Sequence, residues 1–213
     1  MRRSLTLVEL IFSMIIIALA FSVIPKVLQV SSKTSKAALK EEALYNAFAL
    51  MGMIKNLPWD EQNNFYDDIL LTTGGKSAYR CGRRWDGYYR RGSFVGSRNC
   101  FQRVPASALG LESGGLLDDI DDFTNKKITA AGKNMERIYE LEVDVAYVED
   151  MDPYPGTIRF STVKQTDSTN TKYITIQVHA LSKVKEFAQR FGLVRYHAHN
   201  IGQILVNKIA WDQ

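Results

Sequence analysis

Four carboxylates lie within five residues of this chain, at Asp118, Asp119, Asp121 and Asp122. Hard cations such as Ca²⁺ bind several oxygen ligands, so this run of acids is a candidate calcium site. It is not an EF-hand loop, because Phe123 stands where a third oxygen ligand is needed and no glycine follows. The alternative is a solvated acidic loop that caps the next segment. The sequence leaves both interpretations open.

A second cluster combines arginines with aromatic residues between Tyr79 and Arg103. Seven arginines fall between Arg80 and Arg103, against a single acid. Guanidinium groups beside aromatic faces suit nucleic-acid binding led by the phosphate backbone. The candidate nucleic-acid residues are Arg83, Arg84, Arg90 and Arg91. The alternative, which we favour, is a loop with cation–π contacts that docks on another protein subunit.

The chain has two cysteines, Cys81 and Cys100, so a single intrachain disulfide can form. Closing a loop of about 20 residues contributes roughly 3 kcal/mol in the chain-entropy model. Such a bond requires an oxidising compartment, and two unpaired cysteines in a cytosolic protein are the alternative. The sequence contains neither a G-x-S-x-G motif nor a Cys–His signature of nucleophilic catalysis. We therefore expect no enzyme.

The N-terminal segment is long and apolar enough to enter a bilayer. The 21 residues from Leu5 to Pro25 carry one charge, Glu9, and as a helix they would span roughly 31 Å. A carboxylate in hydrocarbon costs about 2.5–3.5 kcal/mol, so Glu9 needs a functional explanation. Arg2 and Arg3 precede the segment, and the positive-inside rule therefore keeps the N-terminus cytoplasmic while the rest of the chain crosses.

A secretory signal peptide is one interpretation of this segment. Residues Ala18–Phe21 fit a small-x-small cleavage site, and cleavage would release a periplasmic binding protein that starts at Phe21. Against it, Glu9 would lie inside the apolar region, and the apolar pattern continues past Ala20 without a break.

A second interpretation explains the acid. The stretch SLTLVE, Ser4 to Glu9, resembles the processing motif of type IV prepilins and type II secretion pseudopilins. The resemblance implies leader cleavage between Ser4 and Leu5 and N-methylation of Leu5, although Ser4 and Leu5 depart from the usual Gly and Phe. It also implies that Glu9 pairs with the Leu5 amine of a neighbouring subunit during assembly. Pro25 lies where helices of this family commonly kink.

The resemblance implies a structural subunit, a minor pilin or pseudopilin, of a type II secretion pseudopilus or a type IV pilus. Its partners would be other such subunits, a prepilin peptidase and N-methyltransferase, and the inner-membrane assembly platform. It would wait in the inner membrane as a single-pass protein with a periplasmic C-terminal domain. A DNA-binding minor pilin of a DNA-uptake pilus stays open as an alternative. Apart from the candidate Ca²⁺, no cofactor is required.

The elements that position these residues follow from periodicity. The chain has 213 residues, of which 46% are hydrophobic and 23% charged, with a net charge of +4. This composition is ordinary for one globular domain plus an appendage. After Pro25 the pattern becomes amphipathic, and Pro58 ends the helix. The apolar face that recurs at three- to four-residue spacing consists of Leu44, Phe48, Met51 and Ile54.

Beyond a loop-rich region the period changes to two, which indicates strands. Residues 138–149 alternate, residues 156–163 and 172–181 follow across short connections, and residues 192–211 supply a final strand or two. The expected fold is α+β and pilin-like, with a long N-terminal helix packed on an antiparallel sheet. The expected parts are a leader (1–4), a transmembrane and fibre-core helix (5–25), its amphipathic half (26–58), and a globular domain (59–213) with a disulfide loop (81–100).

Overall fold

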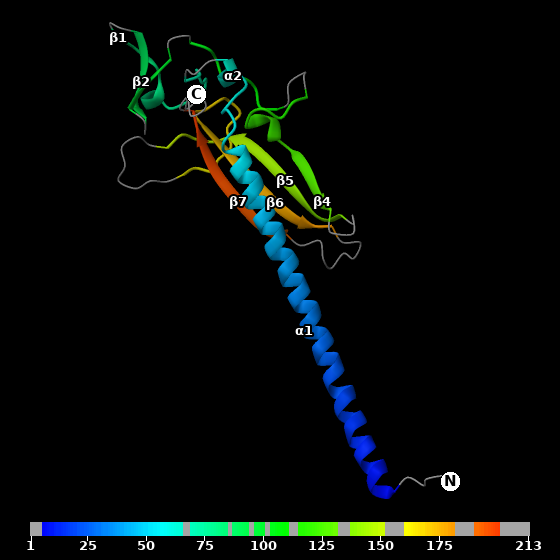
Figure 1. Cartoon of the computed structure of the whole chain (residues 1–213). Coiled ribbons are helices and arrows are strands. Elements are labelled where there is room, and N and C mark those ends of the chain that lie inside the picture. The colour runs from blue at the N-terminus through cyan, green and yellow to red at the C-terminus, as the bar shows by residue number, and fades with distance from the viewer. Residues whose placement is uncertain are drawn as a thin grey trace, which may run out of the picture. The chain divides into compact units, whose positions relative to one another are not determined.

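The computed structural model describes nine stretches of the chain (Figure 1), which are residues 6–65, 69–84, 87–93, 96–100, 103–110, 115–131, 137–151, 160–181 and 190–200. The predicted leader and its cleavage site at Ser4 and Leu5 lie outside the described residues. The chain divides into two compact units, Met1–Ala43 and Leu44–Gln213. Each unit is described by itself.

Helix α1 runs from Leu7 to Ile54 and confirms the predicted long N-terminal helix. Pro25 lies inside it, with helical backbone on both sides, and a bend at this residue stays a prediction. The hydroxyls of Ser13 and Ser22 donate hydrogen bonds of 2.8 Å to the carbonyls of Leu10 and Leu19. The apolar half of α1 therefore satisfies these polar groups within the helix itself.

In the second unit, the last turns of α1 bury one narrow stripe. Ala47, Met51 and Ile54 are buried, at the spacing of four and three residues expected for one helix face. Phe48 is 59% exposed, so its predicted place on this face is wrong. Each residue turns the helix by about 100°, and the small side chain of Ala47 takes the inward position instead.

The main sheet is an antiparallel meander in the order β4-β5-β6-β7. Its strands are β4 (Lys126–Ala131), β5 (Arg137–Tyr147), β6 (Thr171–Ala180) and β7 (Arg190–His199). Strands were expected at the positions of β5, β6 and β7, whereas the edge strand β4 was not. A strand was also expected at 156–163. Residues 160–163 lie in no strand, so the prediction is wrong there, and residues 156–159 lie outside the described residues. Strand β5 pairs with β4 along one edge and with β6 along the other.

The face of this sheet that meets the end of α1 carries the apolar core. Strand register places Leu141 beside Val178, Val143 beside Ile176 and Val145 beside Ile174, and all six side chains are buried. The Leu44 side chain lies over Gly192 of β7, where an added Cβ would overlap Leu44 Cδ2 and lie 3.3 Å from its Cγ. Glycine therefore lets the helix approach the sheet closely at this point.

A smaller antiparallel sheet, in the order β1-β2-β3, holds the arginine-rich segment. It consists of β1 (Gly82–Arg84), β2 (Gly87–Ser93) and β3 (Gly96–Asn99). The predicted disulfide is present: Cys81 and Cys100 are bonded, with Cα atoms 6.4 Å apart. The described residues of the second unit also form the short helices α2 (Gln62–Phe65), η1 (Ser77–Tyr79) and η2 (Asp121–Phe123).

Candidate functional site

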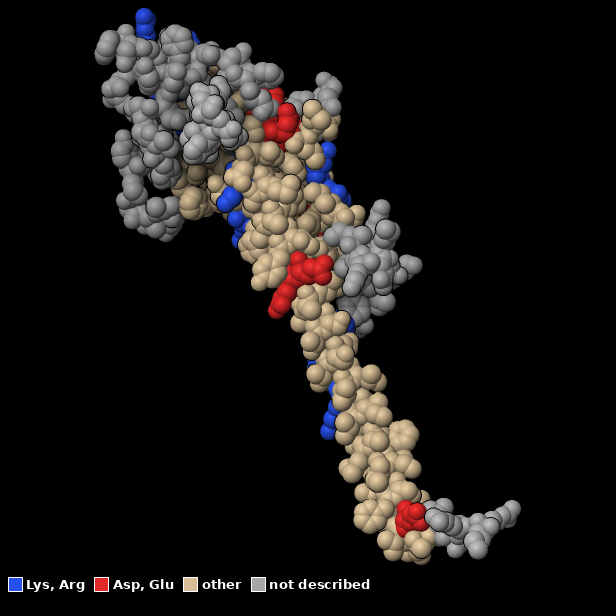
Figure 2. Space-filling view, viewed as in Figure 1, with Lys and Arg blue, Asp and Glu red and all other residues tan. Residues whose placement is uncertain are grey.

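The N-terminal half of α1 is a surface of exposed apolar side chains. From Leu7 to Val30 its large hydrophobic residues are about half exposed or more, and the helix is long and apolar enough to cross a membrane. Glu9 is the single acid between residues 6 and 40. Figure 2 shows the same pattern, a tan helix surface with one acidic patch near its N-terminal end.

Glu9 lies in the first turn of α1, three residues after Thr6. The Glu9 backbone N–H donates to Thr6 Oγ1 at 3.4 Å, which makes Thr6 the helix cap. Thr-x-x-Glu is the pattern of a capping box, and a carboxylate is favourable at this end of the helix dipole. Glu9 thus has a local role that requires no partner subunit. Its favourable position at the helix N-terminus was expected from the sequence, whereas the Thr6–Glu9 capping pattern was missed.

The acidic run begins exposed and then turns inward. Asp118 is exposed, whereas Asp119 and Asp122 are fully buried, so the predicted solvent exposure of this loop is wrong, although its predicted role in capping the next segment is confirmed. Asp119 Oδ1 accepts hydrogen bonds from the backbone of Asp121 (2.9 Å) and Asp122 (3.2 Å). Asp122 Oδ2 accepts from the backbone of Asp118 (3.0 Å) and Asp119 (3.2 Å). These two carboxylates therefore hold the turn that forms η2.

Asp121 instead points to a buried lysine. Lys172 Nζ lies 2.5 Å from Asp121 Oδ1 and 3.7 Å from Asp60 Oδ2, and all three side chains are fully buried. The ammonium also donates to the Trp59 carbonyl at 2.5 Å and lies 4.1 Å from the centroid of the Trp59 ring. Side chains alternate between the two faces of a strand, so Lys172 lies on the same inward face of β6 as Ile174. This alternation could have predicted from the sequence that the Lys172 side chain enters the core.

The carboxyl groups of this centre are strongly perturbed. Burial raises the pKa of Asp119 to about 9, and the neighbouring Asp121 carboxyl adds to the effect. Burial also raises the pKa of Asp121, against the opposing charge of Lys172. Burial raises the pKa of the Tyr147 hydroxyl as well, with the Asp60 charge as the next cause. The surroundings of Lys172 therefore disfavour further negative charge.

The structure changes the ligand set that the sequence suggested for a metal. Asp60, Glu61 and Asp121 each offer one oxygen, and these atoms lie within 4.8 Å of one another. Among the described residues this is the one such group, so the four acids between residues 118 and 122 do not form a joint ligand set. Asp60 and Glu61 follow the end of α1, and nothing in their local sequence connects them with residue 121.

The arginine cluster is divided between core and surface. Arg90 is only 2% exposed and donates to Asn170 Oδ1 at 2.8 Å and to the Asn200 carbonyl. It therefore joins the small sheet to the segments beside β6 and β7, and its prediction as a nucleic-acid residue is wrong. Arg83 is exposed on β1, whereas the side chains of Arg84 and Arg91 lie outside the described residues.

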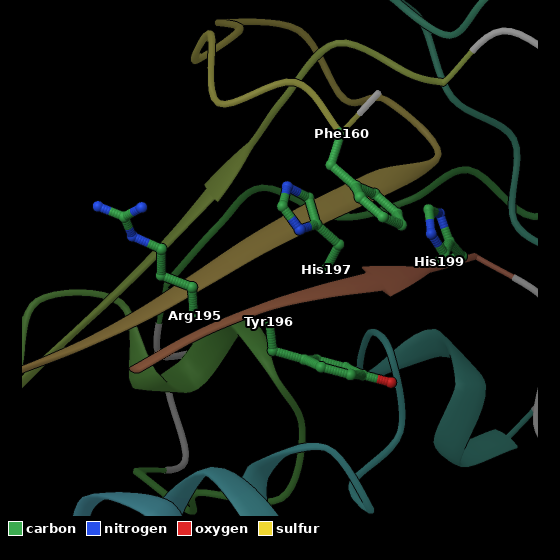
Figure 3. A pocket seen from close by; sticks show the side chains of 5 residues that line it. All are labelled: Phe160, Arg195, Tyr196, His197 and His199. Atoms are coloured by element: carbon green, nitrogen blue, oxygen red, sulfur yellow. The ribbon is translucent and has the colours of Figure 1, made fainter. Parts of the chain in front are cut away.

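A shallow groove of about 410 Å³ lies beside β7 (Figure 3). Phe160 stacks on His197 with ring centroids 4.9 Å apart, and His197 Nε2 lies 2.9 Å from the Ser161 carbonyl oxygen. Tyr196 points to the other side of the strand, as Figure 3 shows. Burial lowers the pKa of His199, the further histidine of the groove. These contacts fasten the segment after residue 160 onto the sheet.

Comparison of the chain with protein-family models, with curated proteins and with solved structures gives no match. The functional argument therefore rests on the residues of this chain and on their geometry.

Proposed function

We propose that this chain is a structural subunit, a minor pilin or pseudopilin, of a type II secretion pseudopilus or a type IV pilus. The observation that carries the proposal is a long, exposed apolar helix with a single acid, Glu9, in its first turn. A helix of this kind has two states that cover its surface, insertion in a bilayer and packing among copies of itself. Subunits that move from a membrane into a fibre pass from one state to the other.

The processing steps follow from the motif. A prepilin peptidase removes residues 1–4, and Leu5 becomes a methylated N-terminus. The new ammonium lies four residues before Glu9, near the positive end of the helix dipole. In the fibre, Glu9 of one subunit pairs with the Leu5 amine of the next. An ion pair excluded from water fixes register more than it adds stability, because both charges lose their hydration.

The proposed orientation places the second unit in the periplasm. Arg2 and Arg3 precede the apolar segment and favour a cytoplasmic N-terminus. The Cys81–Cys100 disulfide needs an oxidising compartment, which supports the same orientation. The inner membrane and its assembly platform are then the partners before assembly, and other subunits are the partners afterwards.

The two alternative functions have less support than the proposed pilin or pseudopilin subunit. The DNA-binding minor pilin loses Arg90 from its candidate surface, because that guanidinium is buried against Asn170 and Asn200. A binding protein released at Phe21 would discard Glu9, and α1 continues as a helix across Ala20 and Phe21.

The Glu9→Gln variant tests the assembly step. Glutamine serves in a capping box as glutamate does, so this variant keeps the helix cap and removes only the charge. The assay measures the fraction of the chain that enters sheared fibres, in a cell that produces the matching assembly machinery. We expect Glu9→Gln to remain in the membrane fraction, and Glu41→Gln, which removes an exposed acid from the same helix, to assemble normally. Normal assembly of Glu9→Gln would refute the pairing.

A further inference from the structure

An ammonium and a carboxylate meet in the interior of the second unit. The side chains of Lys172 and Asp121 are fully buried, and Lys172 Nζ lies 2.5 Å from Asp121 Oδ1. The same ammonium lies 3.7 Å from Asp60 Oδ2, so a lysine rather than a metal ion takes the place between these two acids. A buried ion pair keeps little net stability, because both charges lose their hydration. An amide between the same two groups would carry no charge and would avoid this cost.

The two groups are close enough to react. A C=O bond is about 1.23 Å long, so Lys172 Nζ lies at most about 3.7 Å from Asp121 Cγ. Reacting atoms in near-attack geometries are about 3–3.5 Å apart, and groups held in this way reach effective concentrations of about 10⁵–10⁸ M. The fold therefore supplies the concentration that a free amine and a free acid lack in water.

Asp119 places a proton beside the same carboxyl group. The Asp119 and Asp121 side chains hydrogen-bond each other, and a bond between two carboxyl groups requires a proton on one of them. Burial raises the pKa of Asp119 to about 9, so Asp119 carries this proton at neutral pH. Without it, Asp119 Oδ2 and Asp121 Oδ2 would have no donor among the described residues. Asp119 is therefore positioned as an acid that polarises the Asp121 carbonyl.

The surroundings of Lys172 Nζ exclude water and suit an amide nitrogen. The Trp59 ring centroid lies 4.1 Å from Nζ and the Tyr147 centroid 5.5 Å from it, and both side chains are buried. Exclusion of water protects a reaction product from hydrolysis. The Trp59 carbonyl oxygen lies 2.5 Å from Nζ, so it is placed to accept the single N–H that an amide nitrogen keeps.

From this geometry we propose that Lys172 and Asp121 form an intramolecular isopeptide bond after the second unit has folded. One ammonium proton moves to Asp121 Oδ1, and the amine lone pair attacks Cγ, whose other oxygen is polarised by Asp119. The tetrahedral intermediate then expels Oδ1 as water, together with a second ammonium proton that Asp60 relays. A C–N bond forms, a C–O bond breaks, and the third proton stays on the amide nitrogen. The net charge does not change, and the reaction needs no co-reactant.

The bond would join η2 to the start of β6, 51 residues away along the chain. A covalent link of this kind restricts the unfolded chain as a disulfide does. Chains that have not reacted keep the ion pair, and Lys172→Met removes both the ion pair and the bond. This inference does not depend on the proposed function, because both residues lie in the second unit.

Peptide mass spectrometry tests the bond on the full chain, purified in detergent micelles, then reduced and denatured before digestion with trypsin. Trypsin cuts after a lysine only when its amino group is free. The bond should therefore block cleavage after Lys172 and join residues 104–126 to residues 165–183 in one branched peptide, lighter by one water than the sum of the two. We expect this peptide from the unmodified chain.

Cleavage after Lys172 and two separate peptides, from a chain with native circular dichroism before denaturation, would overturn the proposal. A branched peptide that contains Asp60 in place of Asp121 would overturn the choice of the acid. Lys172→Met should yield no branched peptide, and a branch in this variant would assign the link to another lysine and overturn the proposal as well.

Matched variants test the role of Asp119 in a time course after pulse labelling in the cell. Asp119→Asn keeps the oxygen that binds the backbone of η2 but has no acid proton, so the branched peptide should form about 100-fold more slowly. Asp118→Asn removes an exposed acid of the same run and should react as fast as the unmodified chain. Equal rates in the two variants would contradict the role of Asp119 as the acid.

Discussion

Replacement of Lys172 by methionine tests the buried charge centre directly. Methionine keeps an unbranched apolar chain in the core but removes the ammonium that binds Asp121 at 2.5 Å. Removal of one partner from a buried ion pair costs about 3–5 kcal/mol, because the other charge stays buried without compensation. Stabilities of folded domains are about 5–15 kcal/mol, so this single substitution removes a large share of the total.

The measurement is urea and thermal unfolding of the full chain in detergent, followed by circular dichroism, with EGTA present throughout so that no metal ion compensates. For a unit of this size each kcal/mol lowers the midpoint by about 2–4 °C, so we expect a decrease of about 6–20 °C. Double substitution with Asp121→Asn should recover part of the loss, with a coupling energy of about 1–3 kcal/mol.

Lys164→Met is the matched control. Lys164 Nζ lies 2.6 Å from Asp144 Oδ2, a distance close to that of the buried pair, but the lysine side chain is 63% exposed. An exposed ion pair contributes about 0–1 kcal/mol, so the control should lower the free energy of unfolding by no more than this. If Lys172→Met costs no more than Lys164→Met, the argument that burial governs the energetics of this centre is refuted.

Three further predictions use the same unfolding assay. Gly192→Ala should lower the free energy of unfolding by about 1–3 kcal/mol, because the added Cβ overlaps Leu44. The double variant with Leu44→Ala should lose less stability than the two single losses combined, and strict additivity would contradict the contact. Reduction of Cys81–Cys100, closed over 19 residues, should cost about 3 kcal/mol, and an unchanged midpoint would contradict this. Burial lowers the pKa of His199 below 6.5, so on acidification this histidine binds a proton in the unfolded chain before it does so in the folded chain. The free energy of unfolding should therefore fall as the pH falls from 6.5 toward the folded pKa. His199→Gln should lose this slope, and an identical slope would assign the dependence to other groups.

Local patterns predicted much of the fold. The apolar N-terminal run and the strict alternation of residues 138–149 each specify one period, and α1 and β5 follow from them. The single pair of cysteines left one possible disulfide within the chain, and Cys81 and Cys100 form it. The edge strand β4 escaped prediction because its sequence, KKITAA, contains few of the β-branched and aromatic residues that favour strands.

The side-chain centre could be predicted only in part. The acidic run was visible in the sequence, but the burial of its side chains was not. The turn of η2 carries Asp119, Asp121 and Asp122 into the interior. Asp60 and Lys172 approach Asp121 from 61 and 51 residues away along the chain, and only the completed fold brings the three together. The error at Phe48 has a different origin, since a larger apolar residue was preferred over Ala47 for the buried face.

The central claim is that the chain is cleaved between Ser4 and Leu5, and that the new N-terminus at Leu5 leads into α1. The most direct test is mass spectrometry of the N-terminal peptide from the chain purified out of a cell with an active prepilin peptidase. The account predicts a peptide that begins with N-methylated Leu5 and retains Glu9. A chain that still begins at Met1, or one that begins at Phe21, would contradict it.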